Sequence, residues 1–193
     1  MSKVKYLGII IVIIIFAIIT VPSLIDRIEN NQIVENNRTS SAFPLSYIKI
    51  NNEARKVPDF LFYNQDSLII TNEDFKGKIY VAEFFFTRCP SICPIMNNNM
   101  KRIENKFGKR DDFGIASFTI DPDNDRPHVL KYYAESYDIF STNWHFLTGN
   151  KKDVYSLANK GFNIFASINP EVAGGFEHQG YFALIDKKGY IRS

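Results

Sequence analysis

Two cysteines, Cys89 and Cys93, carry the strongest chemical signal in this sequence. They are the only cysteines among 193 residues and stand four positions apart in the segment FFFTRCPSICP, residues 84–94. The apolar run before them is typical of a buried strand, and Pro90 suits the first position of a helix, so Cys89 is the expected N-cap. Because the N-terminus of a helix favours negative charge, these thiols should ionise readily. The pair therefore predicts copper binding, thiol redox chemistry or both.

The spacing of the pair leaves several kinds of site open. At i and i+4 the two side chains lie on one side of the first helical turn, within reach of one metal ion or of each other. A purely structural disulfide is one alternative, and its short loop would contribute roughly 2 kcal/mol. The spacing is one residue longer than Cys-x-x-Cys, which suits a metal at least as well as rapid exchange. Two thiolates favour Cu(I), and an added imidazole makes a site that can also hold Cu(II) or zinc.

The three histidines differ as candidates for that imidazole. His128 falls in the first turns of an expected helix and should face solvent. His145 falls in a short expected strand, where a packed core or edge position is expected. His178 lies in the loop GGFEHQG, residues 174–180, just before an apolar strand, and loops held between rigid elements often carry ligands. The local sequence makes His178 a candidate ligand and leaves its role open.

Strands that alternate with helices are expected to position these residues. An eight-residue run with almost no polar character, 79–86, is typical of a central strand buried on both faces. Asp125 is placed to cap the helix that follows it. The other expected elements are a hairpin (58–62 and 67–71), helices at 90–107, 126–137 and 151–160, strands at 113–120, 144–147 and 181–185, and a closing hairpin turn at 186–189 into residues 190–192. This order predicts a three-layer α/β domain with a mixed sheet.

A long apolar segment precedes the domain. Residues 6–25 are almost continuously apolar and reach the length that crosses a bilayer. Lys3 and Lys5 precede this segment, so residues 1–5 are expected in the cytoplasm and the rest of the chain outside it. A cleavable signal peptide is the alternative, but no small-x-small cleavage site follows the apolar run. The sequence therefore favours an uncleaved transmembrane anchor.

Composition sets limits on the remaining chain. Residues 26–56 are assigned to a tether, polar over much of its length, and residues 57–193 to one folded domain. The whole chain has 17 Phe and 10 Tyr, so its folded domain can bury a large aromatic core. The net charge is only +2 and no cluster of Lys and Arg stands out, so nucleic-acid binding has little support.

Four segments in order resemble one known family. FFFTRCPSICP resembles the Phe-Thr-x-Cys-Pro-x-x-Cys-Pro signature of the Sco/SenC copper-chaperone family. TIDPDNDRP (119–127) is similar to its Ser-x-Asp-Pro-x-x-Asp-x-Pro segment, and WHFLTG (144–149) to its Trp-x-x-Leu-x-Gly. Glu177 and His178, followed by FALID (182–186), resemble its Asp-His-x-x-x-x-x-Leu-Ile-Asp. The resemblance spans about residues 57–192.

The resemblance implies a fold, a cargo and a partner. It implies a thioredoxin-like domain that is held to the cytoplasmic membrane by one N-terminal helix and faces the periplasm or outer surface. Cys89, Cys93 and His178 would bind copper, as Cu(I) or Cu(II), for delivery to cytochrome c oxidase subunit II or another copper-receiving protein. Such a protein is a metallochaperone rather than an enzyme. The alternative is an extracytoplasmic thiol-disulfide reductase that acts through Cys89 and Cys93 on that subunit or another partner. A peroxidase-like enzyme, with Arg88 beside a reactive cysteine, is a third option.

Three features depart from the family pattern. Ser91 replaces the acidic residue that often follows the first Cys-Pro, and Glu177 replaces the Asp before the histidine. Both changes alter the charge around the ligands and leave the ligands themselves in place. The chain stops at Ser193, within the last hairpin, whereas the family continues through that strand into a closing helix. We therefore expect one side of the sheet to lack its cover.

Overall fold

The computed structural model of the chain describes residues 16–17, 20–22 and 45–192. The chain divides into two units, Met1–Pro44 and Leu45–Ser193, and in the first the described residues are helical. Residues 1–5, most of the predicted anchor 6–25 and residues 26–44 of the predicted tether lie outside the described residues. Within the described part of the chain, no helix has the length and apolar character needed to span a membrane.

A four-stranded mixed sheet forms the centre of the second unit. Its strands, in spatial order, are β10 (Phe182–Ile185), β5 (Ile79–Phe85), β6 (Phe113–Thr119) and β7 (Trp144–Leu147). Strands β5, β6 and β7 are parallel, and β10 runs antiparallel to β5. Every residue of β5 except Ile79 is buried, as the almost entirely apolar run predicts. The mixed sheet is therefore confirmed.

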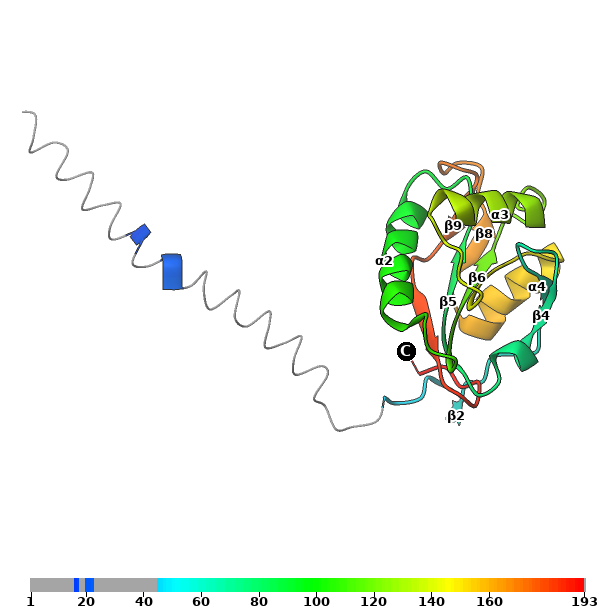
Figure 1. Ribbon diagram of the computed structural model, residues 1–193, viewed down its shortest axis with the longest axis horizontal. Helices are drawn as coiled ribbons and strands as arrows, with labels where there is room; N and C mark the ends of the chain where they lie inside the picture. Colours follow the sequence, from blue (N-terminus) through cyan, green and yellow to red (C-terminus); the bar gives the residue numbers. More distant parts are fainter. Residues whose placement is uncertain (1–15, 18–19, 23–44, 193) are drawn as a thin grey trace, which may run out of the picture. The chain divides into compact units, whose positions relative to one another are not determined.

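Helices cover both faces of this sheet. They are α2 (Ile92–Phe107), α3 (Pro127–Ser136) and α4 (Lys151–Ser156), which continues into the π-helical turn η2 (Leu157–Phe162). Phe85 stacks on Tyr133 of α3, whereas its neighbour Phe84 packs against Phe162 of η2, because successive strand residues point to opposite faces. Figure 1 shows α2 and α4 on opposite sides of β5 and β6. The predicted three-layer α/β architecture is confirmed.

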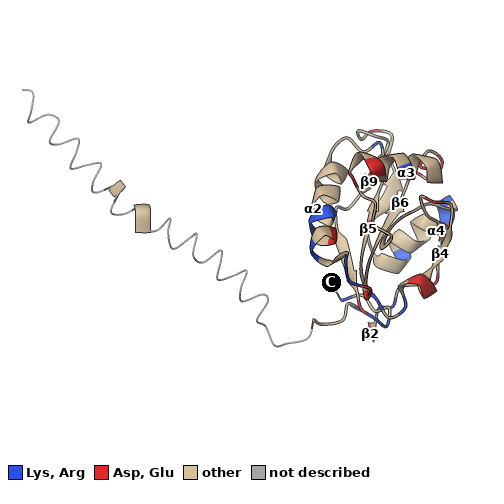
Figure 2. Cartoon of the chain, viewed as in Figure 1, with Lys and Arg blue, Asp and Glu red and all other residues tan. Residues whose placement is uncertain are grey.

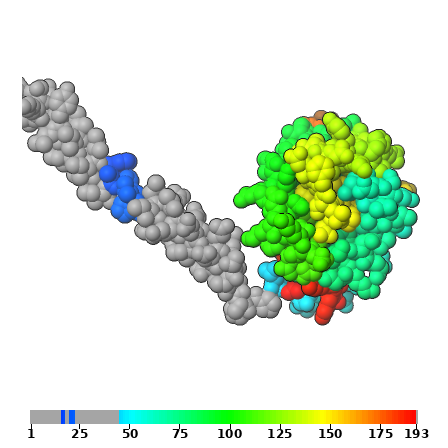
Figure 3. Space-filling model, in the orientation of Figure 1, coloured from blue at the N-terminus to red at the C-terminus, as the bar shows by residue number. Residues whose placement is uncertain are grey.

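The edge strand β7 is covered by a hairpin of β3 (Leu61–Tyr63) and β4 (Ile69–Thr71), which leads into the 3-10 turn η1 (Asn72–Phe75). Gln65, in the hairpin turn, accepts a hydrogen bond from the Phe146 amide and donates one to the Trp144 carbonyl. One side chain thus satisfies backbone groups that an edge strand would otherwise expose. In Figure 3 the hairpin (cyan to teal) and the segment between α3 and β7 (yellow) pack side by side on one face.

A short N-terminal hairpin covers part of the opposite edge. It consists of β1 (Lys49–Ile50) and β2 (Glu53–Ala54). The Ile48 amide donates to the Ile191 carbonyl, and the Ile191 amide donates to the Arg55 carbonyl. Ile191 in turn pairs with Ile185 at the end of β10. The compact unit therefore includes residues 45–56, which the sequence analysis placed in the tether.

Charged groups of both signs are interspersed over this unit (Figure 2). Several form ion pairs between elements: Lys151 lies 2.8 Å from Asp123, and Lys187 lies 2.8 Å from Asp112. These pairs are exposed to solvent and contribute little to stability. The stability of the second unit therefore rests mainly on the buried apolar side chains, which include Phe62, Phe118 and Trp144.

Four local predictions were wrong. Helix α2 begins at Ile92 with Ser91 as N-cap, so Cys89 is not the cap. Helix α3 is capped by Arg126, since the Asp125 carboxylate turns into the protein. The helix expected over 151–160 is α-helical only to Ser156. The loop expected around His178 contains a two-stranded hairpin, β8 (Ala166–Ile168) with β9 (Phe176–His178).

Candidate metal centre

Strand β5 delivers Cys89 to the site through a tight turn. After β5 ends, the Cys89 amide donates to the Phe86 carbonyl at 3.2 Å, which reverses the chain before α2 begins. The turn is tied down by Asp125, whose carboxylate accepts from the Thr87 amide at 3.0 Å, from the Thr87 hydroxyl and from the Thr119 hydroxyl at the end of β6. This buried carboxylate fixes where the first cysteine lies.

Cys93 lies in the first turn of α2 and contacts the first cysteine through its backbone. Its amide donates to the Cys89 sulfur at 3.4 Å, so that sulfur takes one of the free N–H groups at the helix N-terminus. The Ser91 side chain makes no capping bond and lies 3.9 Å from the same sulfur. Both cysteines are buried and neither is in a disulfide. Although Ser91 is the N-cap residue, the Cys89 sulfur accepts the backbone N–H that a capping side chain usually accepts.

His178 reaches the thiols from the end of β9. In the loop before this strand, Gly174 has φ of +90°, and a Cβ there would lie 2.8 Å from the Phe86 ring. Only glycine allows the backbone to approach the Phe86 ring this closely. The Phe86 ring in turn packs edge-on against the His178 ring, with 5.9 Å between the ring centroids. The His178 Nδ1 lies 3.2 Å from the Gln179 carbonyl, which can only accept, so Nδ1 carries the hydrogen. The lone pair of Nε2 is left free for the site.

These three residues form one cluster. The His178 Nε2 lies 3.3 Å from the Cys93 sulfur, and the two sulfurs and a ring nitrogen all lie within 4.8 Å of one another. With metal–sulfur bonds of about 2.3 Å and metal–nitrogen bonds of about 2.0 Å, ligands of one ion lie up to roughly 4.5 Å apart. The cluster therefore brings together the three sequence candidates near the separation that one ion requires. Two sulfurs and an imidazole suit copper or zinc.

The two thiols differ strongly in acidity. The hydrogen bond from the Cys93 thiol lowers the pKa of Cys89 well below its usual range despite partial burial. The same shared proton, together with burial, raises the pKa of Cys93 far above its usual range. Before a metal binds, the site at neutral pH thus holds one negative charge, centred on Cys89 and hydrogen-bonded by Cys93.

Access to the site is one-sided. A shallow pocket of about 210 Å³ opens beside Cys89, between the start of α2 and the loop before β9. Cys93 is fully buried and does not line this pocket. The pocket is lined by Phe86, Cys89, Ser91, Ile92, Val172, Ala173, Phe176, Glu177 and His178. An incoming group would therefore meet Cys89 and His178 first.

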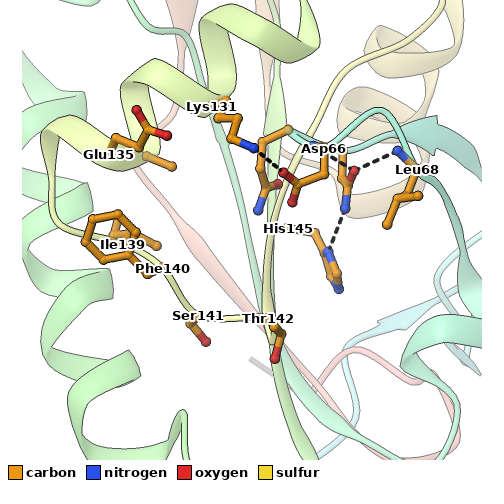
Figure 4. Close-up of a pocket in the computed structure, with 12 residues that line it drawn as sticks. Asp66, Leu68, Lys131, Glu135, Ile139, Phe140, Ser141, Thr142 and His145 are labelled. Carbon is orange, nitrogen blue, oxygen red and sulfur yellow. Dashed lines mark hydrogen bonds and ion pairs between the residues drawn. The ribbon is translucent and has the colours of Figure 1, made fainter.

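The other sequence candidates lie outside this cluster. His128 is exposed on α3, as expected. His145, on the edge strand β7, accepts a weak hydrogen bond from Asn64 and lines a separate pocket with the ion pair Lys131–Asp66 (Figure 4). Arg88, which a peroxidase-like reaction would place beside the thiolate, extends to Asp121 at 2.7 Å.

Sequence reasoning missed the supporting role of two aspartates. Asp121 and Asp125 were read as parts of a turn and a helix cap, yet both are buried and hold the segment before Cys89 through Arg88 and Thr87. Their place directly after a buried parallel strand, at the same sheet edge as the cysteines, was the available signal. Of the two residues that replace acidic or Asp positions of the family motifs, Ser91 lies near the Cys89 sulfur, and Glu177 accepts a hydrogen bond from Asn169 at the surface.

Comparison with known proteins assigns the chain to a family. Residues 49–193 match the family model described as SCO1/SenC. The chain belongs to the SCO1/SenC family. The SCO1 protein homolog of Bacillus subtilis (strain 168) is 36% identical over 138 residues, which are 70% of this chain and 71% of that protein. The expected family resemblance is confirmed.

Two solved structures share the fold of this family member. BsSco, described as a Sco family cytochrome c oxidase assembly protein with a disulfide switch, is 35% identical with a TM-score of 0.63, over 72% of this chain and 81% of that chain. Yeast Sco1 with copper bound is 25% identical with a TM-score of 0.58, over 72% of this chain and 78% of that chain. The mixed α/β fold therefore matches Sco structures.

Proposed function

We propose that this SCO1/SenC protein binds copper through Cys89, Cys93 and His178 and passes it to cytochrome c oxidase subunit II during oxidase assembly. The observation that carries the proposal is the cluster of two sulfurs and one imidazole nitrogen within 4.8 Å. The copper-bound state of yeast Sco1 and the assembly role given for BsSco support the cargo and the process.

The chemistry of the cluster suits copper transfer. Cys89 supplies a ready thiolate, His178 supplies the Nε2 lone pair, and Cys93 binds after its proton leaves. Three ligands leave room on the ion for a fourth, so a thiolate or imidazole of the receiving protein can join before a ligand of this chain departs. The pocket beside Cys89 is the side from which such a group would approach. Copper would thus move by ligand exchange without release into water.

The test is a Cu(I) titration of the full 193-residue chain, without oxygen and against a competing chelator. We expect one tightly held copper per chain, loss of tight binding in Cys93→Ala, and clearly weaker binding in His178→Ala. The matched control is His128→Ala, because that histidine is exposed on α3, outside the cluster. Full affinity in Cys93→Ala would show that the site is misassigned.

We also propose that the chain is anchored in the cytoplasmic membrane by residues 6–25, with the copper site on the extracytoplasmic side. The apolar length of this segment and the preceding Lys3 and Lys5 support this orientation. Cell fractionation and protease treatment of intact and opened cells test it. Recovery of the chain away from the membrane, or protection of the domain while the cytoplasmic membrane is intact with digestion only after the cells are opened, would count against the proposal.

A second candidate function is reduction of a partner's disulfide, and the inequality of the thiols favours it. The accessible Cys89 thiolate would attack the disulfide and release one partner thiolate; Cys93 would then attack Cys89, forming an intramolecular disulfide and releasing the second. A disulfide switch is described for the relative BsSco, which supports thiol-disulfide chemistry in this family. Trapping of partner thiols should require both cysteines and survive His178→Ala, and loss of reduction in that variant would argue against this function.

A further inference from the structure

A thioether lies one helical turn after Cys93. Met96 of α2 is buried, with 3% of its surface exposed. Residues three apart on a helix lie on the same face, and long side chains lean back over the preceding turn of the helix. The side chain of Met96 is therefore expected over the turn that carries Cys93. Because methionine sulfur is a soft, polarisable atom, this position matters beside a site for a soft metal ion.

The sulfur of Met96 lies against the segment that carries His178. Gly180 follows His178 by two residues, and a Cβ at position 180 would lie 3.6 Å from the Met96 sulfur. The same Cβ would lie 3.0 Å from Ile92, in the first turn of α2. These two segments also meet where the His178 Nε2 lies 3.3 Å from the Cys93 sulfur. The thioether therefore lies where the segments that carry Cys93 and His178 come together.

Packing of the main core does not account for this position. Among the described residues, the buried apolar side chains that pack together as the main core include Met100, one turn further along α2, but not Met96. The neighbouring Ile95 is 59% exposed. Met96 is thus buried apart from the main core, beside the candidate ligands.

The site has a buried side and an open side. The pocket that gives access to it is lined by Cys89 and His178, whereas neither Cys93 nor Met96 lines this pocket. The Ser91 hydroxyl, a harder donor, lies on the open side at 3.9 Å from the Cys89 sulfur. The two sides thus offer different kinds of additional donor, which are a sulfur on the buried side and an oxygen on the open side.

We propose that the Met96 thioether is a fourth, weak ligand of the copper ion, bound from the buried side of the site. The inference deepens the proposed function and rests on it, since it takes copper as the cargo of Cys89, Cys93 and His178. Thioether sulfur favours Cu(I), so Met96 sets the preference of the site for the reduced ion. Because a neutral thioether binds more weakly than a thiolate, Met96 can give up its place when a ligand of the receiving protein enters through the pocket. That exchange breaks one copper–thioether bond and forms one bond to the incoming ligand, with no change in oxidation state.

The test is X-ray absorption at the copper edge on the full chain with selenium in place of methionine sulfur. The protein is produced with selenomethionine and loaded with one Cu(I) per chain without oxygen. Selenium bound to copper is distinguished from sulfur because it is a heavier neighbour. We expect a copper–selenium contribution in the native chain, its loss in Met96→Leu and its retention in Met100→Leu. Met100→Leu is the matched control, because Met100 lies on the same helix and is fully buried in the main core.

Binding affinity gives a second readout with ordinary methionine. Met96→Leu keeps the apolar character and most of the volume of the side chain, so the fold should be retained. Its Cu(I) affinity should fall roughly tenfold, the lower end of the range for groups that support a metal site. Its Cu(II) affinity should change little, because thioether sulfur favours Cu(I). Met100→Leu should change neither affinity, and a purely structural role of Met96 would lower both affinities alike.

Two results would overturn the proposal while leaving the three-ligand site intact. One is copper held by the native chain with no selenium neighbour, and the other is a Cu(I) affinity that falls no further than the Cu(II) affinity in Met96→Leu. If Met96→Leu does not fold, as judged by circular dichroism, selenium-labelled Met100→Leu decides. Of the described residues, only Met96 can then supply selenium, so a selenium neighbour supports the proposal and its absence overturns it. A native chain that binds no copper would instead refute the proposed function, and this inference with it.

Discussion

At the scale of single residues, the site depends on how each buried polar group is satisfied. The Cys89 sulfur accepts from the Cys93 amide and Asp125 accepts from several donors, whereas the buried Glu83 of β5 has one hydrogen-bond partner among the described residues. A buried carboxyl with a raised pKa binds its proton more tightly in the folded chain than in the unfolded chain. That difference makes stability depend on pH in a direction that can be worked out.

We predict that Glu83 makes the native chain less stable as pH rises. Its pKa rises from 4.5 in the unfolded chain to about 7 in the folded chain, so its stabilising effect is complete below pH 4.5, falls between these values and is absent above about pH 7. At 1.36 kcal/mol per pKa unit, the total is about 3 kcal/mol. Urea denaturation at pH 5 and pH 8 should show this loss in the native chain relative to Glu83→Gln. The same pH dependence in both proteins would contradict the prediction.

Asp125 gives the second prediction at this scale. Asp125→Ala leaves the Thr87 amide and the buried Thr119 hydroxyl without their acceptor, which should destabilise the fold by about 3 kcal/mol. Because Thr87 precedes Cys89, copper affinity should fall as well. Chemical denaturation and the Cu(I) titration measure the two effects. Asp123→Ala, which breaks an exposed pair with Lys151, should change both little; comparable losses in the two variants would refute the specific role of Asp125.

At the scale of elements, the hairpin of β8 and β9 decides whether His178 meets the thiols. Its ends are closed by Gln179, whose amide and side chain both bond to Phe165, and by Asn159 of η2, which bonds to both backbone groups of Ala166. The turn before β9 contains two glycines with positive φ, at 174 and 175. The glycine pair is therefore part of the machinery that holds the histidine ligand.

We predict unequal effects when these two glycines are replaced. An alanine at 174 must adopt φ of +90° and places its Cβ 2.8 Å from the Phe86 ring. A Cβ at 175 would meet no atom within 4 Å among the described residues apart from its chain neighbours. Gly175→Ala should cost about 1 kcal/mol for its backbone alone, and Gly174→Ala about 3 kcal/mol because packing strain adds to it. Gly174→Ala should also weaken Cu(I) binding. Equal stability and affinity in the two variants would show that contact with Phe86 does not matter.

The sequence predicted long elements well and short ones poorly. Strand β5 and helix α2 have dense, periodic patterns, so their presence was clear before the fold was known. Strands β8 and β9 have three residues each and contain Ser, Glu and His, so their pairing depends on tertiary contacts that no local pattern shows. The start of α2 was misplaced because the Cys89 amide bonds back to Phe86, a turn that Pro90 does not reveal.

At the scale of the whole molecule, the site joins segments far apart in the chain. The three candidate ligands, at residues 89, 93 and 178, come from three segments: the loop after β5, the first turn of α2 and the end of β9. The cysteines could be found from their spacing alone. His178 could not, because its loop position made it only a candidate, and the family resemblance alone implied a ligand role. Glu83 was hidden for the opposite reason: a single acid in an apolar run does not disturb the pattern of a buried strand.

Because the ligands come from distant segments, copper should bind the folded chain far better than the unfolded one. Binding that is specific to the folded state stabilises it by mass action, about 4 kcal/mol at a free ligand concentration 1,000 times Kd. For a domain of this size, this corresponds to a rise in Tm of roughly 8–16 °C. Thermal unfolding in chelator-buffered Cu(I), followed by circular dichroism, measures this rise.

The variants separate a folded three-ligand site from copper held by two flexible thiols. His178→Ala should keep both cysteines yet lose most of the rise in Tm, because two thiolates four residues apart can also bind copper in the unfolded chain. His128→Ala should keep the full rise. An undiminished rise in His178→Ala would mean that the end of β9 does not hold the metal. The copper site would then be local to the start of α2, and the third ligand would have to come from the receiving partner.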